Sequence, residues 1–389
     1  MIDVPSLIDE FTHSESPETR YNEDDHRLAS TTKLRLTLVC KEWYCIAIEL
    51  LYEDIPYLSF AKTKMLLYTL QEEKYSNEAL EKPKGLIGTP ARGLGWWTKT
   101  LHVRHDTNYP PSYFFNLLVR LIPYFPNLVA FHSTERMTTW ACVHESLAKA
   151  IRESNQSVQY FAYDHWAGES HELPRVVTPS YLALPSLRLL DSSWAKEQFS
   201  PSSTIQHIQL TTLKLALDPA GGVNGLEKIQ LPCLRHVSLR NHVSIDNSFL
   251  RFFNIHGPQI VSFGTDITAS KLLGNAIMKR FTSLEDLLLR DQVWWLYSGT
   301  SHANPTVVRL GIWMTDLFRP LQPSQAVLGL SWFPNLKGVR VMDSRADDWE
   351  NKEWEGLEAF VPKATQIAYE DMSGRVVRGV TMVPSTTDS

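Results

Sequence analysis

A short motif recurs eleven times between about residue 96 and the C-terminal region. Each copy has a proline or polar corner, an apolar residue, two further residues and an alternating strand, as in FPNLVAFHSTE and LPCLRHVSLRN. These copies are 23 to 30 residues apart, close to the roughly 20–29-residue period of leucine-rich repeats. A unit this short can bury its apolar side only against its neighbours, so the repeat predicts a stacked solenoid. The aligned strand positions are Val103, Ser133, Tyr163, Ser192, Leu215, Leu239, Thr265, Leu289, Ile312, Val341 and Tyr369.

Helical patterns lie between several of these strands. They cover residues 112–125, 144–153, a stretch after Asp246, a stretch after Ser270 and residues 348–360. Strand and helix alternating at this period predict parallel strands joined by helical crossovers. The expected fold class is therefore α/β: a small helical head followed by a curved leucine-rich-repeat-like solenoid. A generic α/β domain is the alternative for the same elements.

Before the repeats, the stretch from Thr32 to Ile55 has the periodicity of an amphipathic helix. One apolar face holds Leu36, Val39, Cys40, Trp43, Ile46, Ala47 and Leu50. A second set, Leu34, Leu38, Cys45 and Ile48, lies to the side. Two apolar faces on one short helical stretch need two covering surfaces. The rest of the chain can supply one surface, and a partner protein can supply the other.

This stretch resembles the second half of an F-box. The run Leu36-Thr37-Leu38-Val39-Cys40-Lys41-Glu42-Trp43, followed by Ile46-Ala47 and Leu50-Leu51-Tyr52, matches the family's apolar cluster, Val-Cys, basic residue and Trp in register. The family usually opens with Leu-Pro-x-Glu-x-Leu, and the nearest segment here is residues 4–11, about twenty polar residues earlier. With the repeats and the LGWWTKTLHV run at 94–103, the whole chain resembles fungal F-box proteins.

The resemblance implies a substrate-recognition subunit of a cullin-RING ubiquitin ligase, with no catalytic residues and no cofactor. The head would bind a Skp-type adaptor, and through it a cullin, while the repeats would hold an unknown protein substrate. The matching adaptor-binding positions are Leu7, Ile8, Leu36, Leu38, Val39, Cys40, Trp43, Ile46 and Ala47.

Alternate strand residues point away from the solenoid core. The candidate substrate-binding residues on that side are Arg240, Arg290, Trp313 and Arg340. The complete outward set is His102, Arg104, His132, Thr134, Asp164, Asp191, Lys214, Ser238, Arg240, Asp266, Leu288, Arg290, Trp313, Arg340, Met342 and Glu370. Its signs are mixed, which favours a protein partner over nucleic acid.

Composition narrows the function classes. The net charge is -5 with 43% hydrophobic residues, so neither nucleic acid nor an anionic membrane is an expected partner. No apolar run reaches a membrane span, and four scattered cysteines predict reduced thiols in the cytoplasm or nucleus. Motifs for metal, nucleotide or nucleophilic chemistry are not found, and the His102/His105 pair lies on a predicted strand rather than on a helix.

The expected organisation has five parts. Residues 1–30 form an acidic, largely disordered N-terminus with a short helix, and residues 31–73 form the F-box-like helical region. A linker covers 74–95, the repeats cover 96–371, and a disordered tail covers 372–389. A leucine-rich-repeat-like scaffold whose degenerate F-box serves only as a cap is the alternative function, and an enzyme with an unrecognised site is a further one.

Overall fold

The computed structural model describes fourteen stretches of the chain, in two compact units that we treat separately. The N-terminal unit holds the described residues up to Leu210, and the C-terminal unit holds those from Thr211. The described stretches are 23–79, 93–104, 111–133, 141–154, 157–163, 181–194, 206–217, 226–240, 247–265, 278–289, 304–312, 333–341, 368–370 and 376–379.

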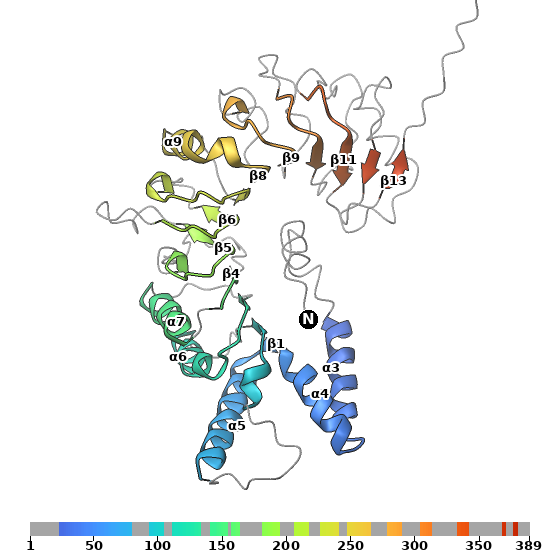
Figure 1. Cartoon of the computed structure of the whole chain (residues 1–389), viewed down its shortest axis with the longest axis vertical. Coiled ribbons are helices and arrows are strands. Elements are labelled where there is room, and N and C mark those ends of the chain that lie inside the picture. The colour runs from blue at the N-terminus through green and yellow to red at the C-terminus, as the bar shows by residue number, and fades with distance from the viewer. Residues whose placement is uncertain are drawn as a thin grey trace, which may run out of the picture. The chain divides into compact units, whose positions relative to one another are not determined.

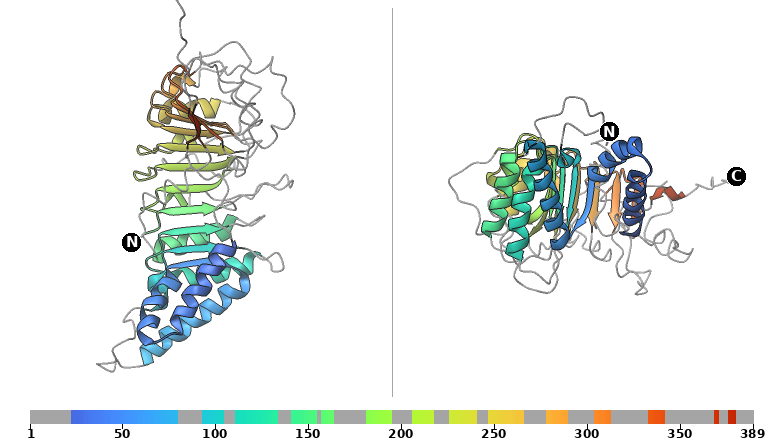
Figure 2. Two further views of the ribbon diagram at one scale, coloured as in Figure 1. Left: turned by 90° about the vertical axis from the view of Figure 1, so that its right-hand side faces the viewer. Right: turned by 90° about the horizontal axis from the view of Figure 1, so that it is seen from below.

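The N-terminal unit begins with helices and continues as alternating strands and helices. Its elements are α3 (Glu23–Thr37), α4 (Lys41–Glu53), β1 (Asp54–Leu58), α5 (Phe60–Ala79), η1 (Leu94–Trp97), β2 (Thr100–Val103), α6 (Pro111–Leu121), η2 (Ile122–Tyr124), β3 (Ala130–Ser133), α7 (Ala141–Ser154), β4 (Tyr160–Tyr163) and β5 (Leu189–Trp194). In its described part, β1 to β5 pair in chain order and all in parallel. Helices α5, α6 and α7 stand side by side along one face of these strands, and α3 and α4 lie apart from that row (Figures 1 and 2).

The C-terminal unit continues the same pattern with shorter helical segments. Its elements are β6 (Thr212–Leu217), η4 (Leu226–Lys228), β7 (His236–Arg240), α9 (Asn247–His256), η5 (Gly257–Gln259), β8 (Ser262–Thr265), η6 (Met278–Arg280), β9 (Asp286–Leu289), β10 (Arg309–Ile312), β11 (Gly338–Val341), β12 (Ala368–Glu370) and β13 (Val376–Gly379). Neighbouring strands from β6 to β12 pair in parallel, and β13 pairs antiparallel with β12. The fold is therefore an α/β leucine-rich-repeat-like solenoid with helices at its N-terminal end, as predicted.

The core of each unit is a row of apolar side chains in register on successive strands. In the N-terminal unit, Leu101, Phe131, Phe161 and Leu190 face one another across β2 to β5 and are at most 1% exposed. The rings of Phe131 and Phe161 stack at 5.2 Å. The corresponding row of the C-terminal unit is Leu213, Val237, Phe263, Leu287, Leu310, Val339 and Tyr369, with at most 3% exposure.

Within each unit, the same pair of backbone hydrogen bonds recurs between one repeat and the next. The carbonyl oxygen of Lys99, just before β2, accepts the N–H groups of both Val129 and Ala130, at 2.7 and 2.9 Å. The carbonyl of Thr211 accepts in the same way from Arg235 and His236. The carbonyls of Val129, Gln159, Arg235, Val261, Glu285 and Val308 repeat the arrangement. Because one acceptor fixes two successive donors, these bonds set the strand register.

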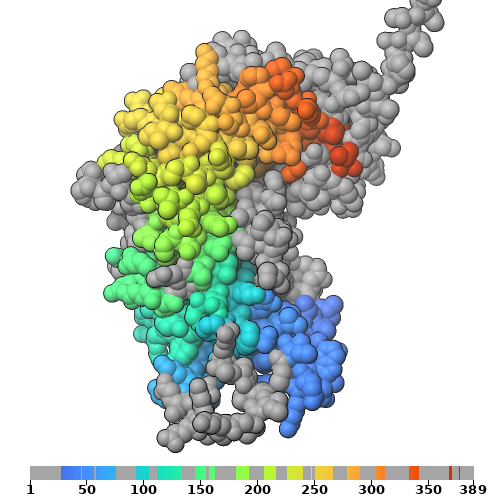
Figure 3. Space-filling view, in the orientation of Figure 1, coloured from blue at the N-terminus to red at the C-terminus, as the bar shows by residue number. Residues whose placement is uncertain are grey.

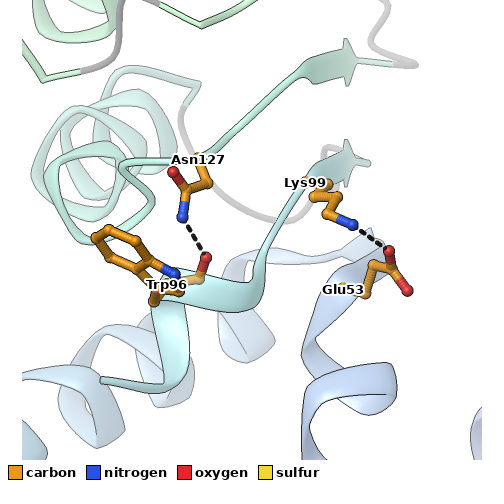
Figure 4. Close-up of polar contacts among 4 residues, drawn as sticks. All are labelled: Glu53, Trp96, Lys99 and Asn127. Carbon is orange, nitrogen blue, oxygen red and sulfur yellow. Dashed lines mark hydrogen bonds and ion pairs between the residues drawn. The ribbon is translucent and has the colours of Figure 1, made fainter. Parts of the chain in front are cut away.

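Polar side chains at the corners bind backbone carbonyls of the preceding repeat. Asn127 donates from Nδ2 to the carbonyl of Trp96 at 2.9 Å (Figure 4). Buried Asn304 donates to the carbonyls of both Met278 and Phe281, at 3.1 and 3.0 Å. The buried His256 ring contacts the Ile229 carbonyl through Nε2, and burial lowers its pKa. These side chains therefore join neighbouring repeats at the corners, in addition to the backbone bonds along the strands.

The eleven aligned positions all fall within strands β2 to β12, so the predicted repeat is confirmed. Register agrees from Leu215 through to Val341 on β11. The last pair is wrong by two residues, because Val339, not Val341, faces Tyr369. Helices α6, α7 and α9 occupy predicted helical stretches. The capping residue Asp246, residues 270–277 and the helix predicted at 348–360 lie outside the described residues.

The single helical stretch predicted from Thr32 to Ile55 is wrong. Two helices, α3 and α4, cover most of it, and its last residues belong to β1. Strand β1 pairs in parallel with β2, and α5 packs beside α6. The first strand–helix repeat is therefore β1–α5, and the predicted start of the repeats at residue 96 is too late.

Three predicted irregular segments contain regular structure. Residues 23–30, expected in the disordered N-terminus, form the start of α3. Helix α5 continues to Ala79 into the predicted linker. Strand β13 lies within the predicted tail, where pairing with β12 supplies its backbone partners.

Asn304 provides a test of the corner bonds. Asn304→Ala removes the donor to two carbonyl oxygens in a site that is 3% exposed. We expect a loss of about 1–3 kcal/mol in the free energy of unfolding, measured by urea denaturation. Asn335→Ala, which removes one exposed bond to the Pro305 carbonyl, is the matched control with a smaller loss. Equal losses in both variants would contradict this role for Asn304.

Candidate functional site

Helices α3 and α4 form a hairpin whose turn interrupts the apolar pattern. The Leu38 and Val39 N–H groups bond to the carbonyls of Arg35 and Leu36, which tightens the end of α3. Thr37 returns its hydroxyl to the Leu34 carbonyl at 2.6 Å, a local bond that competes with helix continuation. Cys40 then has extended backbone angles, φ -159 and ψ 174, and α4 begins at Lys41. The predicted continuous face is thus divided between two helices.

One side of α4 attaches the hairpin to the rest of the unit. Ala47 and Ile48 are buried, with 1% and 7% exposure, and α4 packs on η1. At the end of α4, the Glu53 carboxylate pairs with Lys99 Nζ at 2.7 Å (Figure 4), and the Glu53 carbonyl accepts the Lys99 N–H. The attachment therefore joins α4 directly to the entry of β2.

Segment η1 approaches the next repeat very closely. An added Cβ at buried Gly95 would overlap the carbonyl oxygen of Tyr124. The Trp96 carbonyl accepts the Asn127 side chain in the same region. The absence of a side chain at position 95 thus allows η1, against which α4 packs, to lie close to the Tyr124 carbonyl.

The other side of the hairpin exposes large apolar side chains. Leu38 is 79% exposed, Val39 63%, Ile46 58% and Trp43 47%. We call Leu34, Leu38, Val39, Trp43, Ile46 and Leu50 the α3–α4 surface, and each is at least 43% exposed. The hairpin is the dark-blue region in Figure 3. Exposed apolar side chains gathered on one element are typical of an interaction surface.

The predicted adaptor-binding residues divide into three groups. Leu38, Val39, Cys40, Trp43 and Ile46 are exposed on the turn and on α4. Leu36 is half-buried on α3, and Ala47 belongs to the attachment. Leu7 and Ile8 lie outside the described residues.

Leu34, Tyr44 and Leu50 also expose apolar area on the hairpin, with 52%, 43% and 43% exposure. None of the three was assigned to the adaptor site from the sequence. The helical spacing of Leu34 and Leu50 was visible in the sequence, but spacing alone does not distinguish a face that packs from one that remains exposed.

On the outward side of the N-terminal strands, two of the predicted polar side chains are buried. His102 and His132 were expected to face a partner, yet each is 3% exposed. Their Nδ1 atoms lie 3.3 Å apart with the rings edge to face. His102 Nε2 lies 3.6 Å from Asp54 Oδ1. The expectation of solvent exposure is therefore wrong for both, because these groups cover one another. In the C-terminal unit, Lys214 on β6 is a third outward residue that the structure buries, at 8% exposure.

Burial lowers the pKa of His132 to about 4, although Asp191 opposes the effect. The Nε2 atom of His132 is buried with no hydrogen-bond partner among the described atoms. A proton there would have no acceptor, so the ring is neutral at pH 7. No group of three His, Cys, Asp or Glu side chains in the described part is placed to hold a metal ion. The arrangement of His102 and His132 is best explained as a buried polar contact.

The outward side of the C-terminal strands is more open. Arg309 and Asp286 form a two-point ion pair, with Nη2 and Oδ2 at 2.9 Å. Leu288 and Arg340 are half-exposed on β9 and β11. Of the predicted substrate-binding residues, only the side chain of Arg340 is among those described. The side chains of Arg240, Arg290 and Trp313 lie outside them.

No helix in the described stretches has the length and apolar character needed to cross a membrane.

Comparison with solved structures finds similar chains. The crystal structure of the leucine-rich repeat-containing protein LegL7 from Legionella pneumophila is similar over 72% of this chain and 93% of that chain. The sequence identity is 14% and the TM-score is 0.41. No protein-family model and no curated protein sequence matches the chain. The fold class stated above rests on the chain's own parallel strand pairing and period.

The buried His132 ring predicts a pH dependence of stability. The unfolded state binds a proton near the ordinary pKa of 6.5, while the folded state resists it until about pH 4. Stability is therefore fully present above pH 6.5 and falls by about 3 kcal/mol as the pH drops to 4. His132→Asn retains an N–H group but cannot titrate, so we expect its urea-denaturation profile to be flatter over this range. An unchanged slope would contradict the assignment.

Proposed function

We propose that this protein is the substrate-recognition subunit of a cullin-RING ubiquitin ligase. The α3–α4 surface binds a Skp-type adaptor, and the repeats hold a protein substrate. The subunit itself has no catalytic role. The observation that carries the proposal is the exposure of Leu38, Val39, Trp43 and Ile46, which are the positions where the sequence resembles an F-box.

The size of the exposed side chains supports a partner on this surface. Completely burying a Val, Leu or Phe side chain contributes roughly 1.5–3 kcal/mol, and Leu38 and Val39 keep most of that area open in the free chain. Trp43 is a residue type often found at the energetic centre of protein interfaces. A partner that covers this surface therefore gains a substantial apolar contribution.

The attachment side of α4 supports a second part of the proposal. Ala47, Ile48 and the Glu53–Lys99 pair fix the helix to the start of the repeats. An adaptor bound to the opposite side would then be held beside β1 and β2. We propose that the repeats bind the substrate through four residues of their outward side, Arg240, Arg290, Trp313 and Arg340.

A scaffold whose helices only cap the solenoid is the alternative function. The packing of α4 on η1 is what a cap requires. A terminal cap, however, needs a polar outer face for solubility. The outer side of this hairpin carries Leu38 at 79% and Ile46 at 58% exposure. This feature favours a bound partner over a cap.

The test is co-purification of the full chain with a Skp-type adaptor. We expect Trp43→Ala and Leu38→Asp each to abolish binding, because both change the centre of the α3–α4 surface. Met65→Asp on α5 is the matched control, since Met65 is equally apolar and 70% exposed. Its binding should equal that of the unsubstituted chain.

Circular dichroism and thermal unfolding must show that all three variants retain the folded repeats. Leu38 and Met65 face solvent, so neither aspartate removes a core side chain. Adaptor binding retained by both Trp43→Ala and Leu38→Asp would overturn the proposed function and leave the scaffold alternative.

A further inference from the structure

The turn between α3 and α4 departs from what would stabilise the isolated hairpin. Leu38 and Val39, both apolar, are among the most exposed large side chains of the described residues. Cys40 occupies the N-cap of α4 without a capping side-chain bond. Lys41 then places a positive charge at the positive end of the helix dipole, where an acidic residue is favoured. Departures of this kind concentrate at functional sites.

Cations surround this turn. Arg35 and Lys41 each lie three residues from Leu38 and are exposed, and Lys33, two residues before Arg35 on α3, is half-buried. None of the three makes an ion pair within the described stretches. The nearby acid is Glu42, whose pKa is lowered by its backbone hydrogen bond and by Cys40. Its carboxylate makes no ion pair with any of the three cations in the described part of the chain.

Local stability explains only part of this pattern. Arg35 suits the last turn of α3, where a cation complements the dipole. Lys41 has the opposite effect on α4 and no acidic partner among the described side chains of the hairpin. An acidic group outside the chain would account for Lys41, and Arg35 is a second exposed cation near the same turn.

We propose that the protein docking on the α3–α4 surface presents carboxylates beside an apolar centre, and that Arg35 and Lys41 pair with those carboxylates on either side of Leu38. This inference rests on the proposed adaptor-binding function and specifies the chemistry of the partner. Apolar contact supplies affinity, while the charges orient the partner and accelerate its association.

The experiment measures the Kd of the full chain for a purified Skp-type adaptor at low and high salt. Arg35→Glu/Lys41→Glu reverses both cations, and Lys62→Glu/Lys64→Glu makes the same change in net charge at exposed positions of α5. At about 0.05 M salt we expect the turn variant to bind at least tenfold more weakly and the α5 variant to bind normally. The deficit should shrink at about 1 M salt, where the Debye length is about 3 Å.

Two further variants separate binding from folding. Lys41→Glu alone should leave the Tm no lower than in the unsubstituted chain, because an acid suits the helix start. Arg35→Gln/Lys41→Gln should weaken binding less than the double reversal. This neutral pair decides the question if the reversed pair fails to fold.

The outcomes separate this inference from the proposed function. If Trp43→Ala abolishes binding but the turn variant binds normally at low salt, the acidic-partner inference is overturned and the adaptor role stands. Equal weakening by the α5 variant overturns it too, because net charge would then be responsible. If the unsubstituted chain does not bind the adaptor at all, both proposals fall.

Discussion

The fold depends on a carbonyl group that accepts two donors from the next repeat. At Lys99, Thr211 and equivalent positions, one oxygen binds two successive N–H groups at the entry of the following strand. A shift by one residue would break both bonds and turn the apolar row outward. Register and core are therefore fixed together, repeat after repeat. Segments of very different length between the strands are tolerated because they lie outside this constraint.

The same constraint explains what the sequence could predict. The corner residue and the apolar position three residues later recur because each must reach the turn and the core, so β2 to β12 were found from spacing alone. Strand β1 was missed because DIPYL follows α4 directly and has no such corner. Its Pro56 and its register shift are tolerated at the end of the N-terminal unit's strand order. The predicted alignment of β12 with β11 was wrong because β12 is too short for its sequence to fix the register.

The outward residues of the strands show that the alternation of side chains is not sufficient to predict exposure. The alternation of side chains along a strand predicts that His102 and His132 point away from the helices, and this prediction is correct. Exposure depends in addition on the neighbours, and here Asp54 and the two rings lie together. No local sequence pattern predicts the contact among Asp54, His102 and His132, because the three residues come from strands about 30 to 80 positions apart in the sequence. For the same reason, a row of outward residues is a candidate surface only after its side-chain contacts are known.

The hairpin is subject to two opposing demands on one short helix. Ala47 and Ile48 must pack against the unit, while Trp43, Ile46 and Leu50 stay exposed. A helix of thirteen residues can meet both demands because Ile48 lies on a different face and the small Ala47 lies at the border of the exposed one. The break at Leu38 to Cys40 turns α3 back beside α4 and adds Leu34 to the open side. A lysine at a helix start costs about 0.3–1 kcal/mol, and exposed Leu38 adds nothing to the free chain. Both features gain a physical reason once an apolar partner with acidic groups covers the turn.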